Sequence, residues 1–136
     1  MKIVEWSIEG MVVEYAKRIK ASGKPSPRYE KWVEACSNVI GAISKPIGYV
    51  DVCEIKLMYN KKLPRTNSDR ASAIQDMLKR CNVIESDSYD AMPDTRQKGR
   101  YYQTWGGVKV KLRIDETHPL NQGINWKEFP VIKEWA

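Results

Sequence analysis

Residues 49–87 place an alternating segment, a basic loop, an amphipathic segment and an acidic turn one after another. The alternation over residues 49–59 predicts a strand, and the apolar spacing between Ser68 and Cys81 predicts a helix. This order can bring acidic groups from the helix start and from the later turn, residues 85–87, together beside the cationic loop. Carboxylates next to cations suit a metal ion that acts on a phosphodiester.

Length and composition indicate one soluble domain. The chain has 136 residues, of which 42% are hydrophobic and 29% are charged, enough for a real core. No apolar run approaches the ~20 residues of a membrane-spanning helix. Glu5 stands where a signal peptide would continue apolar, so no export signal is expected. Cys36, Cys53 and Cys81 form no C-x-x-C pair, which argues against a disulfide framework or a zinc knuckle and favours a reducing cytoplasm.

Positive charge points to a polyanionic partner. The net charge is +6, which favours nucleic acid among the partners of a soluble domain. Basic loops that converge on one face of a protein can form a phosphate track. Three clusters of cations are candidates: Lys17, Arg18, Lys20, Lys24 and Arg28; Lys61, Lys62, Arg65 and Arg70; and Arg96, Lys98 and Arg100.

Alternation predicts further strands at both ends of the chain. Residues 2–8 alternate, residues 11–16 are expected to be extended, and residues 108–114 give the clearest strand. Residues 93–100 are polar and predict a loop. The cations of the strand at residues 108–114 are expected to form the solvent-exposed face of an edge strand. Such a surface can also lie on a phosphate backbone. They are Lys109, Lys111 and Arg113.

A second helix precedes the alternating segment. Apolar residues recur at three- and four-residue steps through residues 27–43, with Ser26 as the expected N-cap and residues 45–48 as the expected end. Paired strands with two helices do not follow the alternation of a doubly wound sheet. They predict an α+β domain in which one mixed sheet carries two main helices packed on one face. Residues 116–136 form an extension whose aromatic side chains must pack on the body or on a partner.

Each candidate site residue also has a structural interpretation. Asp69 is the residue type that caps a helix start, and Asp87 is typical of a turn. Glu54 is a solvent-facing strand residue by the same alternation. His118 is the single histidine and lies in a predicted loop. The glycines match neither a P-loop nor a dinucleotide-binding pattern.

Four runs carry a resemblance to a known family. They read R-T-N-S-D-R-A-S from Arg65, D-M-L from Asp76, N-V-I-E-S-D from Asn82 and G-G-V-K-V-K-L from Gly106. In order and spacing they resemble a basic loop ending R-D-x-D-N-L-x-K, a D-A-L helix, a G-V-[I/F]-x-D-D-x-x-V turn and a late G-G-x-x-x-[VIL]-x-[VIL] strand. This is the pattern of the RusA-type Holliday junction resolvases, which are small homodimeric, magnesium-dependent endonucleases of bacteria and their prophages.

The resemblance implies a fold, a partner and a site. It covers roughly residues 1–115 and implies a RusA-like domain there, with residues 116–136 as a C-terminal extension. The implied partner is DNA, branched as in a four-way junction, bound by a homodimer. The implied catalytic carboxylates are Asp69 and Asp87, which would hold Mg²⁺ together with Glu85.

The match departs from the family at its acidic motif. Two of the family's aspartates fall on Thr66 and Ser68, which leaves Asp87 in place and Asp69 one position away. The resemblance therefore allows two functions: a magnesium-dependent endonuclease, or an inactive module of the same fold that binds nucleic acid or protein. In both, the residues expected to position phosphates are Lys61, Lys62, Arg65, Arg70, Lys17, Arg18 and Lys20.

Overall fold

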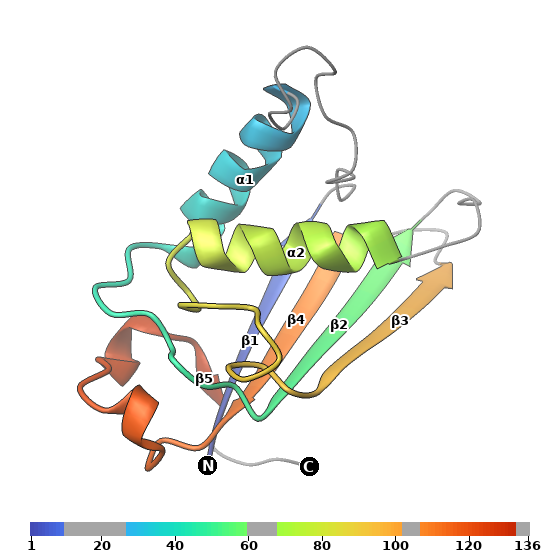
Figure 1. Cartoon of the computed structure of the whole chain (residues 1–136). Coiled ribbons are helices and arrows are strands. Elements are labelled where there is room, and N and C mark those ends of the chain that lie inside the picture. The colour runs from blue at the N-terminus through green and yellow to red at the C-terminus, as the bar shows by residue number, and fades with distance from the viewer. Residues whose placement is uncertain (10–26, 60–67, 102–106, 133–136) are drawn as a thin grey trace.

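Two helices pack on one face of a single mixed sheet, which confirms the predicted α+β architecture (Figure 1). The structure is a computed structural model that describes residues 1–9, 27–59, 68–101 and 107–132. The strand order is β3-β2-β4-β1-β5. The helices are α1 (Pro27–Ile40) and α2 (Ser68–Arg80), and the strands are β1 (Lys2–Glu9), β2 (Val52–Tyr59), β3 (Thr95–Tyr101), β4 (Gly107–Ile114) and β5 (Val131–Ile132).

The central strand β4 pairs antiparallel with both β1 and β2. Strands β2 and β3 are parallel, and α2 makes the crossover between them. The register aligns Val4 with Leu112 across β1 and β4, and Leu112 with Cys53 across β4 and β2. Because side chains alternate between the two faces, this register puts the apolar residues of all three strands on the helix side. They are Val4, Trp6, Ile8, Cys53, Ile55, Leu57, Val108, Val110, Leu112 and Ile114, all buried in the core.

Helix α1 begins at Pro27, as predicted, but ends earlier than the apolar spacing suggested. Gly41 has a φ of +85° and follows the last helical residue, a backbone conformation that glycine adopts without cost at a helix end. Ile43 lies in the segment that follows the helix, and its side chain is still buried in the core. The Tyr29 hydroxyl lies 2.7 Å from Asp76 Oδ2 and 3.0 Å from the carbonyl oxygen of Ala73, so it ties α1 to α2.

Helix α2 matches its prediction closely, and its buried residues include Ile74, Met77 and Leu78. Ala73 is buried as well, although the apolar spacing did not single it out. Within the described ranges, neither helix combines the length and the apolar character that crossing a membrane requires.

Two predictions about the strands are wrong. Residues 93–100 were expected to form a loop, but most of them belong to β3, the edge strand that pairs with β2. Its polar residues do not alternate with apolar ones because both of its faces reach solvent, from Thr95 to Lys98. Conversely, β4 was expected at an edge and is the central strand. The expected extended segment at residues 11–16 lies outside the described residues.

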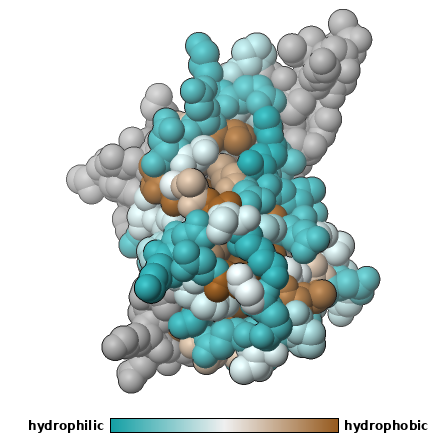
Figure 2. All heavy atoms as spheres, turned by 90° about the vertical axis from the view of Figure 1, so that its left-hand side faces the viewer, coloured by the Kyte–Doolittle hydropathy of each residue, from teal (hydrophilic) through white to brown (hydrophobic). Residues whose placement is uncertain are grey.

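The C-terminal extension packs on the body of the domain. Phe129 and Ile124 are buried in the core, and the ring of Phe129 lies 6.2 Å from that of Trp6. Two short 3-10 turns, Pro119–Asn121 and Trp126–Glu128, lead to β5, which pairs with β1. The side of the molecule that carries these turns is mainly hydrophilic, with scattered hydrophobic residues (Figure 2).

A buried amide helps to fasten this extension to the segment before β2. Asn121 Oδ1 accepts hydrogen bonds from the backbone N–H groups of Gly48 (3.0 Å) and Tyr49 (2.9 Å). Its Nδ2 donates to the carbonyl oxygens of Tyr49 and Asp115, both at 2.9 Å. Asn121 is only 1% exposed, so its hydrogen-bonding capacity is used inside the protein. A Cβ on Gly48 would lie 2.5 Å from the carbonyl oxygen of Leu120, which explains why glycine stands there.

Replacing Asn121 with alanine should destabilise the protein by about 3 kcal/mol, because four backbone groups would lose a buried partner. Urea denaturation followed by circular dichroism measures the change. Asn38→Ala is the matched control, since Asn38 is exposed on α1, and should change the free energy of unfolding by less than about 0.5 kcal/mol. Equal stability of the two variants would contradict this role of Asn121.

Candidate nucleic-acid interface

The face of the sheet opposite the helices carries charged side chains in rows that cross the strands. Strand register defines these rows, since residues paired across neighbouring strands stand side by side on the same face. One row runs from β1 to β3 through Glu5, Lys111, Glu54 and Arg96. Its charges alternate in sign, and it is called the compensated row below.

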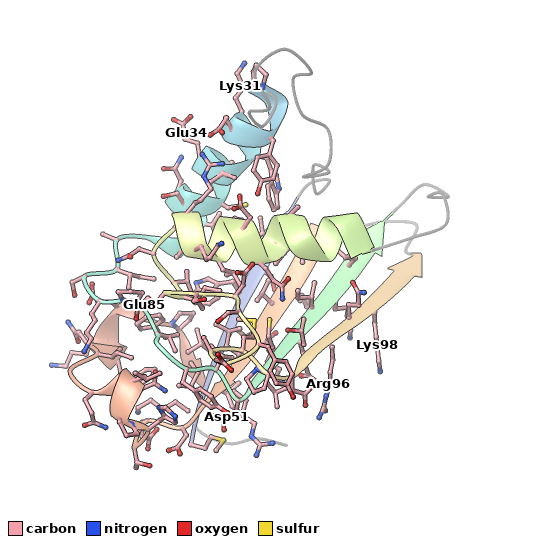
Figure 3. The ribbon with its side chains drawn as sticks, in the orientation of Figure 1. Lys31, Glu34, Asp51, Glu85, Arg96 and Lys98 are labelled. Atoms are coloured by element: carbon pink, nitrogen blue, oxygen red, sulfur yellow. The ribbon has the colours of Figure 1, made fainter. Side chains whose placement is uncertain are left out.

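The next row contains cations alone. Lys109 on β4 is paired with Lys56 on β2, and Lys56 is paired with Lys98 on β3. These three residues are called the lysine row, and Ser7 on β1 stands next to Lys109 at its end. All three lysines are exposed, and none makes an ion pair with another residue of the described ranges. Figure 3 shows Lys98 and Arg96 projecting outward from β3.

The two rows differ in electrostatic energy. Neighbouring strands lie about 4.8 Å apart, and like charges directly opposite each other in a sheet are destabilising. In the compensated row Lys111 stands between two carboxylates, and the Arg96 guanidinium also binds Asp94 at 2.8 Å. The hydrogen bond to Asp94 is the main cause of the raised pKa of Arg96. In the lysine row no ion pair with a described residue offsets the repulsion.

Both rows line one shallow hollow of about 420 Å³ on the uncovered face. Four strands contribute to it, and its charged lining consists of five cations and two carboxylates. The hollow is therefore electropositive, and its cations come from three different strands, β2, β3 and β4. The lining residues are Glu5, Glu54, Ile55, Lys56, Arg96, Lys98, Lys109 and Lys111.

The predicted acidic site lies elsewhere, around α2. The Asp87 carboxylate is 3.4 Å from Nζ of Lys79, in the last turn of that helix. Asp69 stands in the first turn, about 15 Å of helix rise before Lys79. The backbones of Asp69 and Arg70 belong to α2, but their side chains lie outside the described part, so a pairing of Asp69 with Asp87 stays a prediction.

The described residues do not by themselves assemble a magnesium site. Glu85 is exposed, and its backbone N–H donates to the carbonyl oxygen of Ile47 at 3.0 Å. Across the described ranges no three His, Cys, Asp or Glu side chains gather as metal ligands. The other predicted phosphate contacts, Lys17, Arg18, Lys20, Lys61, Lys62 and Arg65, lie outside those ranges.

His118 has a structural role. Its Nδ1 accepts a hydrogen bond from the backbone N–H of Leu120 at 3.1 Å and so caps the first 3-10 turn. Its ring stacks on Tyr49 with a centroid distance of 4.2 Å and an interplanar angle of 1°. The ring thus helps to hold the C-terminal extension against the segment before β2.

The lysine row was not identified from the sequence. The sequence signal that could have indicated it is the placement of cations at alternate positions in three segments. These segments lie around Lys56, Lys98 and Lys109. Of the three, only Lys109 was predicted on a strand face that could meet phosphate, because residues 93–100 were expected to form a loop and Lys56 was not singled out from its strand. Strand pairing was needed to bring the three together.

Comparison with known proteins adds no relative. The chain matches no protein-family model, and no curated protein is significantly similar to it in sequence.

The three cysteines are buried and free. Burial raises the pKa of both Cys36 and Cys53 to about 12, and it also raises the pKa of Cys81. Because the thiolate is the reactive form, these thiols are poor nucleophiles at neutral pH.

The native thiols should react with the reagent DTNB at least about a hundredfold more slowly at about pH 8 than those of the chain unfolded in guanidinium chloride. The native thiols react more slowly because their raised pKa keeps them protonated at this pH. Asn38→Cys, which adds a thiol at an exposed position of α1, is the control and should react at once. A native cysteine that reacts as fast as the added one would contradict the burial.

Proposed function

We propose that this chain binds nucleic acid through the uncovered face of its sheet, with the lysine row as its main phosphate contact. The lysine row itself carries the proposal. Like charges directly opposite each other on adjacent strands destabilise a sheet, and none of the three lysines makes an ion pair with a described carboxylate. A bound polyanion removes this repulsion and releases counterions, which makes binding favourable.

The composition of the face supports duplex or branched DNA over a single strand. Proteins that bind single strands stack bases on aromatic side chains. Strands β1–β4 direct no aromatic side chain to this face within the described ranges. The face runs from Glu5 on β1 to Lys98 on β3. Lysines bind phosphates as point charges, which suits the backbone of a double helix.

The resemblance to RusA-type resolvases supports branched DNA as the natural form of the ligand. The chain shares the order of segments that family uses, and the mixed sheet with two helices on one face agrees with the fold expected from that order. A homodimer is implied by the resemblance, and a two-fold assembly could engage two arms of a four-way junction.

We place this function in binding rather than in cleavage. The carboxylate of Asp87 is engaged by Lys79, and Thr66 and Ser68 stand where the resemblance implies aspartates. Mg²⁺ requires near-octahedral oxygen ligands, and loss of two carboxylates weakens its binding. The described residues thus favour a module that holds DNA.

Replacing Lys56, Lys98 and Lys109 together with alanine should weaken binding to a four-way junction at least about tenfold at moderate salt. The slope of log K against log[salt] should become less negative by about 2.7, since each phosphate contact contributes roughly −0.9. Gel-shift or fluorescence anisotropy across a salt series measures both quantities. Lys31→Ala is the control, because Lys31 lies on α1, away from the sheet face (Figure 3). Unchanged affinity of the triple variant would reject the interface.

With Mg²⁺ or Mn²⁺ present, a four-way junction bound by the protein should stay uncut, because the acidic site lacks two of the expected carboxylates. Denaturing gels of end-labelled junction strands measure cleavage. Cutting that an Asp87→Asn variant abolishes would instead establish the endonuclease and overturn the assignment to binding alone.

A further inference from the structure

We infer that the bound sugar–phosphate backbone crosses the sheet at right angles to the strands, along the lysine row, and that Glu5 and Glu54 impose this direction. This inference rests on the proposed function and deepens it. It concerns which path across the electropositive face a polyanion takes.

A path along a strand meets a carboxylate or an occupied cation. On β2, Lys56 is followed on the same face by Glu54. On β3, Lys98 is followed by Arg96, whose guanidinium is already bound by Asp94 at 2.8 and 3.3 Å. Toward the compensated row, neither strand therefore continues the line of available cations.

The basic line along β4 passes between the two carboxylates. Lys111 follows Lys109 on this face and is paired with Glu5 on one side and with Glu54 on the other. A phosphate over Lys111 would stand within about 5 Å, one strand spacing, of either carboxylate-bearing strand. Repulsion from both sides opposes that position.

The lysine row offers a path without carboxylates. It extends over two strand spacings, about 10 Å, from Lys109 to Lys98. Three lysines on flexible stems over this length can each reach a phosphate of the backbone that crosses them. Ser7 continues the row onto β1 with a small, neutral, exposed side chain.

Two kinds of variant test the direction. The double variant Glu5→Gln, Glu54→Gln should bind a short duplex about three- to tenfold more tightly, because phosphates gain access to Lys111. Glu34→Gln on α1 is the matched control and should leave affinity unchanged (Figure 3). Unchanged or weaker affinity of the double variant would overturn the role of the two carboxylates.

Tethered cleavage then reports the path directly. An iron–EDTA reagent is attached to Ser7→Cys, at the end of the lysine row, or to Arg113→Cys, beyond Lys111 on β4; the native thiols are buried. At saturating protein, cleavage of the duplex from position 7 should exceed that from position 113 at least about fivefold. In the Glu5→Gln, Glu54→Gln background the two should become similar.

The outcomes separate this inference from the function on which it rests. If wild-type protein binds no DNA, the proposed function fails. If it binds through the three lysines but both tethers cut equally, or the tether at position 113 cuts more, only the direction is wrong.

Discussion

The pairing of β4 with both β1 and β2 is the interaction on which the rest of this structure depends. A strand has a side-chain period of two, so a slip of one residue would turn every side chain of β4 to the opposite face. Leu112 would then leave the core, and Lys111 would enter it. The apolar contacts of Val4 and Cys53 with this strand's buried face therefore fix the register. The same register fixes which charges meet on the uncovered face.

Coverage of one face by both helices leaves the other face available. The buried residues of α1 and α2 join the apolar side of the sheet in one core, and the C-terminal extension closes its end with Phe129 and the buried amide of Asn121. The opposite side has no helix over it in the described part of the chain. Charged side chains gather there because they need solvent, but solvent exposure alone does not sort them into a compensated row and a lysine row.

That sorting is the link between fold and proposed function. A surface selected only for solubility gains by alternating the sign of cross-strand neighbours, as the compensated row does. Lys56 instead has a lysine on each side. A polyanion bound along the lysine row would account for this unfavourable arrangement of like charges. The carboxylates of Glu5 and Glu54 would then limit where on the face that polyanion lies.

Sequence patterns identified the helices, the strands with one buried face and the side on which each residue of those strands lies. The edge strand β3 was missed because both of its faces reach solvent, so its residues show no period. The acidic pair Asp69 and Asp87 and the basic loops at residues 17–28 and 61–70 remain predictions, because those side chains, Asp87 excepted, lie outside the described residues. The end of α1 was missed because Gly41, whose positive φ ends the helix, gives no break in apolar spacing.

The sequence by itself determined local properties: period, helix position, and the separation of apolar from charged side chains along each strand. These depend on residues a few positions apart. Tertiary structure alone decided that β4 is central, that Lys56, Lys98 and Lys109 form a row, and that Glu5 and Glu54 flank Lys111. Strand order and register arise from contacts between residues far apart in the chain, and no local pattern specifies which strands become neighbours.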